Sequence, residues 1–249
     1  MRQYCFSVFA FHGNIPYFVP ITITTSMYRL STLFFLLLSF HSLSQNQVGI
    51  FAGPQMSSAV YKIGKQQQET SFKYGFHAGV LMKVPFEGIV SFAPSISYSL
   101  IGYDVDFDRP SSLPDPDAID NSTRFHSVSL APLLQFDLGR GPSHVFIKAG
   151  PSFDFMLKGK ESFQLSGGSQ VDRNVKFGNY DYGYVTANLI GQLGFEKTQG
   201  FYISLNYSYS PANLSNRDGG PTINNQILGF SLGWYLKRKK IVIDTRVKE

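Results

Sequence analysis

The chain has 249 residues, of which 15% are aromatic and only 16% are charged. A water-soluble domain usually carries about a quarter charged residues, whereas a surface in contact with lipid needs aromatic and aliphatic side chains, so this composition disfavours an ordinary soluble fold. The mean hydropathy is near zero, which argues against a bundle of transmembrane helices. The net charge of +5 is dispersed along the chain and does not form a basic patch of the kind that binds nucleic acid.

The N-terminal part of the chain contains a secretory signal. The apolar run Leu30–Phe40 is too short to cross a bilayer as a helix. Its basic start and the small residues after it predict a signal peptide over residues 27–44, cleaved after Ser44. Residues 1–26 lie upstream of that signal and indicate a start site assigned too early, with Met27 as the initiator. The alternative is an ordered N-terminal extension.

Apolar and polar residues alternate with a period of two along the rest of the chain, and no helical stripe of comparable length competes. Several of these segments are longer than a usual strand of about five or six residues and match a tilted bilayer crossing of about 9 to 11. Eight strands are predicted, near residues 47–57, 71–84, 88–103, 123–137, 143–157, 181–196, 200–210 and 225–237.

The apolar face of these strands carries the larger side chains. In the fifth segment Val145, Ile147 and Phe153 alternate with Lys148 and Ser152. The second face is mostly Ser, Gly, Asn and Ala, which suit a narrow, crowded interior and not a surface in water. We therefore predict an all-β fold over residues 45–237, an eight-stranded antiparallel transmembrane β-barrel of the outer-membrane type with an up-and-down meander. An even strand number leaves no unpaired edge in lipid.

The predicted connections alternate between long and short, as in a barrel with external loops and tight periplasmic turns. Short links are predicted at residues 85–87, 138–142 and 197–199. Long loops are predicted at residues 58–70, 104–122, 158–180 and 211–224. This order places both ends of the barrel in the periplasm and makes residues 238–249 a basic periplasmic tail.

Aromatic residues gather near the predicted strand ends. At this level of a membrane barrel, aromatic side chains contact the lipid headgroups. We expect two girdles, formed by Phe72, Tyr74, Tyr103, Phe125, Tyr182 and Tyr184 on the external side and by Phe86, Phe136, Phe195 and Trp234 on the periplasmic side. Pro94, Pro132 and Pro151 interrupt predicted strands, and each removes one ladder donor. Bulges or unpaired donor positions are expected there.

Several short segments have a characteristic order: Val48-Gly49-Ile50-Phe51-Ala52-Gly53, Phe76-His77-Ala78-Gly79-Val80, Pro94-Ser95-Ile96-Ser97-Tyr98, Pro132-Leu133-Leu134-Gln135-Phe136, Gly150-Pro151-Ser152-Phe153 and a glycine-spaced last strand. With the signal before them, they resemble the PorT-like outer-membrane β-barrel proteins of Gram-negative bacteria over residues 47–237. The resemblance implies an eight-stranded barrel in the cell outer membrane and, for some members, a part in secretion or surface assembly. It transfers no catalytic residue or ligand.

Inward-facing polar residues are expected to form a network that fills the lumen. Its predicted members are Lys73, His77, Lys83, Ser95, Ser97, Lys148, Asp154, Asn188 and Asn206. The turn near Pro85 would place His77 opposite Ser95 or Ser97, a pairing that hints at a nucleophile and its base. Asp154 lies on another strand and nearer the external end, so we predict no catalytic residues and no enzyme.

The second long loop is acidic, and Asp104, Asp106 and Asp108 resemble the start of a calcium-binding loop. The sixth position of such a loop should be Gly and the twelfth Glu, but Arg109 and Asp115 stand there. A solvated external loop therefore competes with a loop that contacts a cation, and we predict no dedicated metal site and no cofactor.

These observations predict a monomeric, non-enzymatic outer-membrane barrel that contacts outer-membrane lipid and another envelope protein, and no nucleic acid. One alternative is an outer-membrane enzyme that modifies lipid or peptide, with His77 and Ser95 or Ser97, and His126 near the external surface, as its candidate residues. Another alternative is a soluble lipocalin-like carrier. The basic run Lys237–Lys240 would keep the barrel end in water or contact a periplasmic partner.

Overall fold

The computed structural model describes residues 5–12, 15–22, 46–139 and 141–236 in two units, Met1–Ser44 and Gln45–Glu249. In the first unit β1 (Cys5–His12) and β2 (Ile15–Thr22) form an antiparallel hairpin. This hairpin lies within the segment interpreted above as an upstream extension. The predicted signal peptide and basic tail lie outside the described residues. Within those residues the chain has no helix that is long and apolar enough to cross a membrane.

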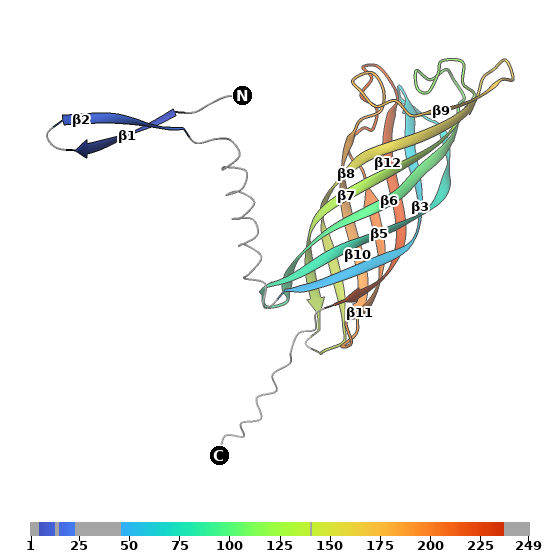
Figure 1. Ribbon diagram of the computed structural model, residues 1–249. Helices are drawn as coiled ribbons and strands as arrows, with labels where there is room; N and C mark the ends of the chain where they lie inside the picture. The colour runs from blue at the N-terminus through green and yellow to red at the C-terminus, as the bar shows by residue number, and fades with distance from the viewer. Residues whose placement is uncertain (1–4, 13–14, 23–45, 140, 237–249) are drawn as a thin grey trace. The chain divides into compact units, whose positions relative to one another are not determined.

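The second unit is a closed ring of eight antiparallel strands (Figure 1). The strands are β3 (Gln47–Ile63), β5 (Glu69–Glu87), β6 (Val90–Asp106), β7 (Asp120–Leu138), β8 (His144–Gln164), β10 (Val185–Glu196), β11 (Phe201–Tyr209) and β12 (Thr222–Tyr235). Each strand pairs with the next one along the chain, and β12 pairs with β3 to close the ring. The predicted eight-stranded meander is therefore confirmed.

Two short strands extend the ring. β4 (Gln66–Gln67) pairs with the end of β3, and β9 (Gln170–Asn174) pairs with the end of β8. They lie with the longer connections at one end of the barrel, which we call the loop end, whereas the short links lie at the opposite turn end (Figure 1).

The side chains are arranged as in a lipid-facing barrel. On β8 the outward-facing Ile147 and Phe153 are 40% and 42% exposed, whereas the inward-facing Lys148 is 3% exposed. We call the outward-facing apolar surface the apolar belt. Its members include Ile50, Val80, Ile96, Leu130, Leu134, Ile147, Phe153, Leu189, Leu193, Leu205, Phe230 and Leu232. The predicted orientation, with bulky apolar residues outside and small polar residues inside, is confirmed.

The first predicted long loop is wrong. Residues 58–70 continue β3 and β5, and the chain reverses tightly at Gly64 and Lys65, where Gly64 has a φ of 61°. The lipid-facing alternation ends near residue 57, which is why the sequence predicts a loop from residue 58. Inward-facing residues such as Ala59 and Tyr61 continue to be buried beyond that point, so the ladder continues as well.

Pro94, Pro132 and Pro151 leave the register of the ladder unchanged and do not cause bulges. Pro94 pairs with Pro132 in register. The β7–β8 ladder has no pairs over the stretch that contains Pro132 and Pro151. The expectation of unpaired positions is met at this place, because a proline has no N–H to donate.

A bulge is present in β5 near the loop end. Between Phe72 and His77 this strand has one residue more than its partner β6. The side chain of Ser57 on β3 reaches β6 at this opening: its Oγ accepts a hydrogen bond from Gly102 N at 2.7 Å and donates one to Gly102 O at 2.8 Å. Because a bulge redirects the side chains beside it, the position of Lys73 differs from the alternating pattern.

Candidate functional site

The middle of the lumen holds a polar cavity of about 70 Å³. Five of the nine residues predicted for the lumenal network line it: His77, Ser95, Ser97, Asp154 and Asn206. A cavity of this size has room for a few water molecules. It is far too small to be a passage for solutes.

His77 has a different partner from the one predicted. It pairs across the sheet with Ser99, because β5 continues to Glu87 before the chain turns. Its Nε2 lies 2.7 Å from Ser231 Oγ on β12. Ser231 also accepts a hydrogen bond from Asn206 Nδ2 at 2.5 Å. The expected contact of His77 with Ser95 or Ser97 is therefore replaced by a chain of hydrogen bonds across β5, β12 and β11.

No acid orients His77. Its Nδ1 is buried and has no hydrogen-bond partner among the described residues. A serine nucleophile needs a base that is itself oriented by a third group. Among the described residues, Ser231 and His77 therefore have no third member of such a triad.

Asp154 and Asn188 lie on the adjacent strands β8 and β10 and are both buried. Asn188 Nδ2 donates a hydrogen bond to Ser152 Oγ at 3.3 Å. These residues extend the polar layer around the lumen. They do not bring a carboxylate into a hydrogen bond with His77.

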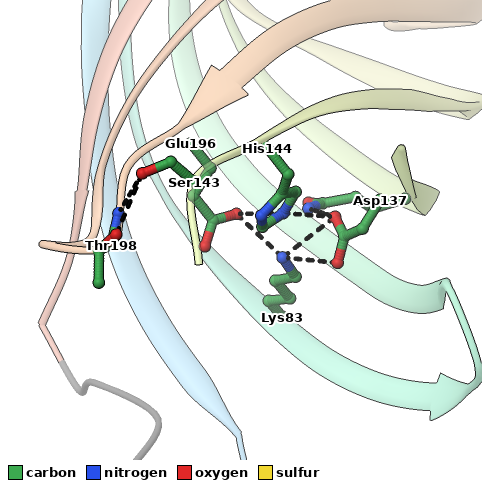
Figure 2. Close-up of polar contacts among 7 residues, drawn as sticks. Lys83, Asp137, Ser143, His144, Glu196 and Thr198 are labelled. Carbon is green, nitrogen blue, oxygen red and sulfur yellow. Dashed lines mark hydrogen bonds and ion pairs between the residues drawn. The ribbon is translucent and has the colours of Figure 1, made fainter. Parts of the chain in front are cut away.

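Charged residues from four strands meet at the turn end of the lumen (Figure 2). Lys83 Nζ lies 3.0 Å from Asp137 Oδ2 and 2.9 Å from Glu196 Oε2. His144 Nε2 lies 3.1 Å from Asp137 Oδ1 and 3.7 Å from Glu196 Oε2. We call Lys83, Asp137, His144 and Glu196 the turn-end ion cluster. It joins four strands of the ring, β5, β7, β8 and β10.

Neighbouring side chains hold this cluster in place. Gln135 Nε2 donates a hydrogen bond to Asp137 Oδ1 at 2.6 Å. Beside the cluster, Ser143 Oγ and Thr198 Oγ1 lie 3.0 Å apart and join two turns (Figure 2). The hydrogen bond from Gln135 fixes the position of the Asp137 carboxylate, which limits the cost of removing its charge from water.

Lys148 is the second lysine of this end and makes a different contact. Its Nζ lies 4.8 Å from the ring centre of Phe146 and 5.0 Å from that of Tyr202. A cation over the face of an aromatic ring is attracted by the electrons of the ring. Lys83 and Lys148 are thus placed at the turn end, outside the central cavity lined by His77.

The ion cluster includes the donor set of a potential metal site. Ligand atoms of Asp137, His144 and Glu196 lie within 4.8 Å of one another, and imidazole with carboxylates suits zinc and related ions. The ammonium of Lys83 lies between the two carboxylates and already supplies the cation that they need. The arrangement works as an ion-pair plug for the lumen.

The loop end is closed by an apolar plug. It consists of Tyr61, Tyr103, Phe125, Tyr182 and Leu214, each at most 1% exposed. Three of these, Tyr103, Phe125 and Tyr182, were predicted to form part of the external aromatic girdle, and that prediction is wrong. They point into the lumen. Tyr182 lies in the loop before β10, and burial raises the pKa of its hydroxyl and keeps it protonated.

The loop between β6 and β7 is tied to this plug. Tyr61 Oη donates a hydrogen bond to Leu113 O at 2.6 Å and lies 2.8 Å from Ser111 Oγ. Arg173 Nη2 donates to Pro114 O at 2.8 Å, and its Nε lies 2.6 Å from Glu161 Oε1. The loop therefore covers the mouth of the barrel.

Lys73 and the acidic residues lie on the outside of the barrel. Lys73 Nζ lies 3.0 Å from Asp104 Oδ1 and donates to Ser122 Oγ at 2.5 Å, on the outer face of β6 and β7. The prediction of Lys73 in the lumen is therefore wrong, because the bulge in β5 redirects it. Asp106 and Asp108 are exposed, and in the described part of the chain they do not join Asp104 in a group of metal ligands.

Asp137, His144 and Glu196 are not among the site residues predicted from the sequence. Each of them lies beside one of the tight links, and His144 pairs directly with Glu196 across β8 and β10. That pairing is not visible in the sequence, because a connection of about twenty residues separates the two strands and does not fix their register.

Comparisons with known proteins agree with this architecture. Residues 43–216 match the model of the family described as outer membrane protein beta-barrel domain. A search of curated proteins found no match to the chain. The match to the family model locates the protein in the outer membrane, with the apolar belt in contact with lipid.

Several solved structures are similar. Ail, the attachment invasion locus protein of Yersinia pestis, has 17% identity and a TM-score of 0.39, and the alignment covers 76% of this chain and 99% of that one. Neisserial surface protein A has 14% identity and a TM-score of 0.39, and the alignment covers 75% of this chain and 96% of that one. OprG from Pseudomonas aeruginosa has 12% identity and a TM-score of 0.41, and the alignment covers 77% of this chain and 96% of that one. The family match itself spans most of the chain, which therefore belongs to the outer membrane protein beta-barrel domain family.

Proposed function

We propose that the protein is a monomeric, non-enzymatic outer-membrane barrel that is exported with a cleaved signal peptide and binds another envelope protein through its loop end. The PorT-like proteins that it resembles suggest a role in secretion or surface assembly in a Gram-negative envelope. The observation that carries this proposal is a lumen closed at both ends, by the apolar plug and by the turn-end ion cluster. A closed lumen leaves the surface as the working part of the molecule.

The loops form a preorganised surface, which supports a role in recognition. Arg217 Nη1 donates a hydrogen bond to Ser112 O at 2.8 Å and so joins the last loop to the one between β6 and β7. Asn216 N donates to Asp181 O at 2.9 Å and joins it to the segment before β10. A surface that is ordered before binding loses less conformational entropy when a partner docks.

Site-specific crosslinking in living cells would test the loop-end partner. A photoreactive amino acid at Tyr180, which is 73% exposed at the loop end, should give a defined crosslinked protein product. The matched control carries the same group at Phe86, which is 81% exposed at the turn end. Products from Phe86 alone, or from neither position, would contradict the proposal.

Conductance measurements would test the closed lumen separately. In planar bilayers the purified protein should show no stable openings, because an eight-stranded barrel leaves an interior that its own side chains can fill. Stable large openings would overturn the closed-barrel proposal and favour a channel. A silent protein that also yields no crosslinks would contradict only the loop-end partner.

A further inference from the structure

On β7 and β8 the apolar belt is followed, toward the loop end, by basic residues. On β7 the outward positions are apolar from Leu138 to Val128, and the next outward residues are His126 and Arg124. On β8 the apolar outward residues end at Leu157 and are followed by Lys158 and Lys160. These basic residues therefore occupy the first polar positions beyond the lipid-facing surface at the loop end. In a barrel this is the level of the lipid headgroups.

The basic residues lie side by side across the two strands. Arg124 pairs directly with Lys160, and His126 pairs with Lys158. Like charges directly opposite each other in a sheet are destabilising. Within the described residues no ion pair joins Arg124, Lys158 or Lys160 to a carboxylate. These residues thus form a concentrated positive charge, which an anion from outside the protein would neutralise.

A hollow of about 570 Å³ on the same outer face contains polar groups suited to a phosphate. Arg124 and Lys160 line it together with the hydroxyl-bearing Ser122 and Ser162. Lys73 borders it as well, held there by Asp104 at 3.0 Å. Two carboxylates also line the hollow, Asp172 and Glu161. Glu161 is paired with Arg173 at 2.6 Å, so the basic residues Arg124 and Lys160 outnumber the remaining carboxylate, Asp172. Cationic and hydroxyl donors are the groups that bind phosphate oxygens.

The opposite side of the barrel lacks this feature. Beyond the belt, the outward positions of β11 and β12 carry Tyr209 and Gln226, and β3 carries Ser58. At the first polar positions beyond the belt, the basic residues therefore lie on β7 and β8 and not on β11, β12 or β3, so a single lipid can be held in a defined position. A uniform ring of charge would attract the bilayer without choosing a site.

We propose that Arg124, Lys158 and Lys160, which we call the lipid-phosphate patch, bind the phosphate groups of an outer-leaflet glycolipid whose acyl chains lie against the apolar belt of β7 and β8. The patch continues the lipid-facing surface, so one molecule satisfies both parts of the site. The phosphates separate the facing charges of Arg124 and Lys160 and remove their repulsion.

Binding of lipopolysaccharide to the purified, detergent-folded full chain would test this proposal. A variant with Arg124→Ala, Lys158→Ala and Lys160→Ala should bind about tenfold or more weakly, since each basic residue near an anionic headgroup contributes on the order of 1 kcal/mol. The control variant, Lys62→Ala with Lys65→Ala, removes exposed charge from the loop end outside the patch. It should bind as the wild type does.

Two further measurements make the result decisive. Enzymatically dephosphorylated lipopolysaccharide should lose binding to the wild type while the intact lipid retains it, and inorganic phosphate alone should compete weakly. Heat-modifiable migration on a gel reports folding, and the triple variant should remain folded in detergent because its substitutions remove facing like charges. Equal binding by wild type and triple variant, or equal binding of the dephosphorylated lipid, would overturn the proposal.

Discussion

The two ends of the lumen are closed by opposite kinds of chemistry. At the loop end Tyr61, Phe125 and Leu214 fill the interior with apolar side chains. At the turn end Lys83 lies between the carboxylates of Asp137 and Glu196. Hydrophobic burial is non-directional and tolerates small shifts, whereas a buried ion pair is stable only in good geometry.

This difference indicates different tasks for the two ends. The apolar plug supports the loops above it, which need a firm base if they are to present a recognition surface. The turn end has only short links to support, and its charges lie where the chain enters and leaves the barrel. Replacing residues at each end separately would show whether the two plugs contribute independently.

The largest effect is expected from Phe125→Ala. Phe125 is fully buried and packs against Tyr103, Phe177 and Tyr182, with ring centres 5.5 to 6.4 Å away. Removing a buried aromatic ring costs about 4 kcal/mol, through lost burial and the cavity that remains. Denaturant unfolding of the barrel in lipid vesicles measures this change.

The control for Phe125→Ala is an aromatic residue at the same end that lies in solvent. Tyr180→Ala removes a ring that is 73% exposed and should change the free energy of unfolding by less than about 0.5 kcal/mol. Equal losses in the two variants would mean that the apolar plug does not stabilise the loop end.

A somewhat smaller loss is expected from Lys83→Met. The substitution keeps most of the side-chain volume but leaves Asp137 and Glu196 without their cation, which costs about 3 kcal/mol for a largely buried pair. Unfolding in the same vesicles should detect this loss. Added salt should change it little, because screening is weak for buried charges.

A combined variant distinguishes the lost cation from lost packing. Lys83→Met together with Asp137→Asn and Glu196→Gln removes both uncompensated charges, so most of the stability should return. If the triple variant is as unstable as Lys83→Met alone, the pairing described at the turn end does not account for the loss.

The strands and their faces could be predicted because the side chains of a strand alternate with a period of two and the lipid selects large apolar residues for one face. This is why His77, Asp154 and Asn206 were correctly assigned to the interior. Lys73 was assigned to the wrong side because one additional residue in β5 inverts the alternation, and no local pattern marks that residue.

The turn-end ion cluster could not be found in the same way. Lys83, Asp137 and Glu196 are far apart in sequence, and they meet only because the ring brings the turn ends of β5, β7 and β10 together. The aromatic residues Tyr103 and Phe125 were misplaced for a related reason. Above the lipid the inside of the barrel becomes apolar, so an aromatic residue near a strand end does not necessarily face the interface.

The smallest effect is expected from Tyr61→Phe, which tests how the apolar plug holds the loop between β6 and β7. The variant keeps the buried ring but loses the hydrogen bonds to Leu113 O and Ser111 Oγ. The loss should be about 1 kcal/mol, typical of a neutral hydrogen bond. Hydrogen exchange should rise in residues 107–119 while the barrel strands remain protected.

The control for Tyr61→Phe is Tyr180→Phe, which removes a hydroxyl from an exposed ring and should leave exchange unchanged. Faster exchange throughout the barrel in Tyr61→Phe would show that the hydroxyl stabilises the whole fold and not the loop. Faster exchange confined to residues 107–119 would mean that the plug and the loop form one unit, in which a single buried hydroxyl anchors the surface offered to a partner.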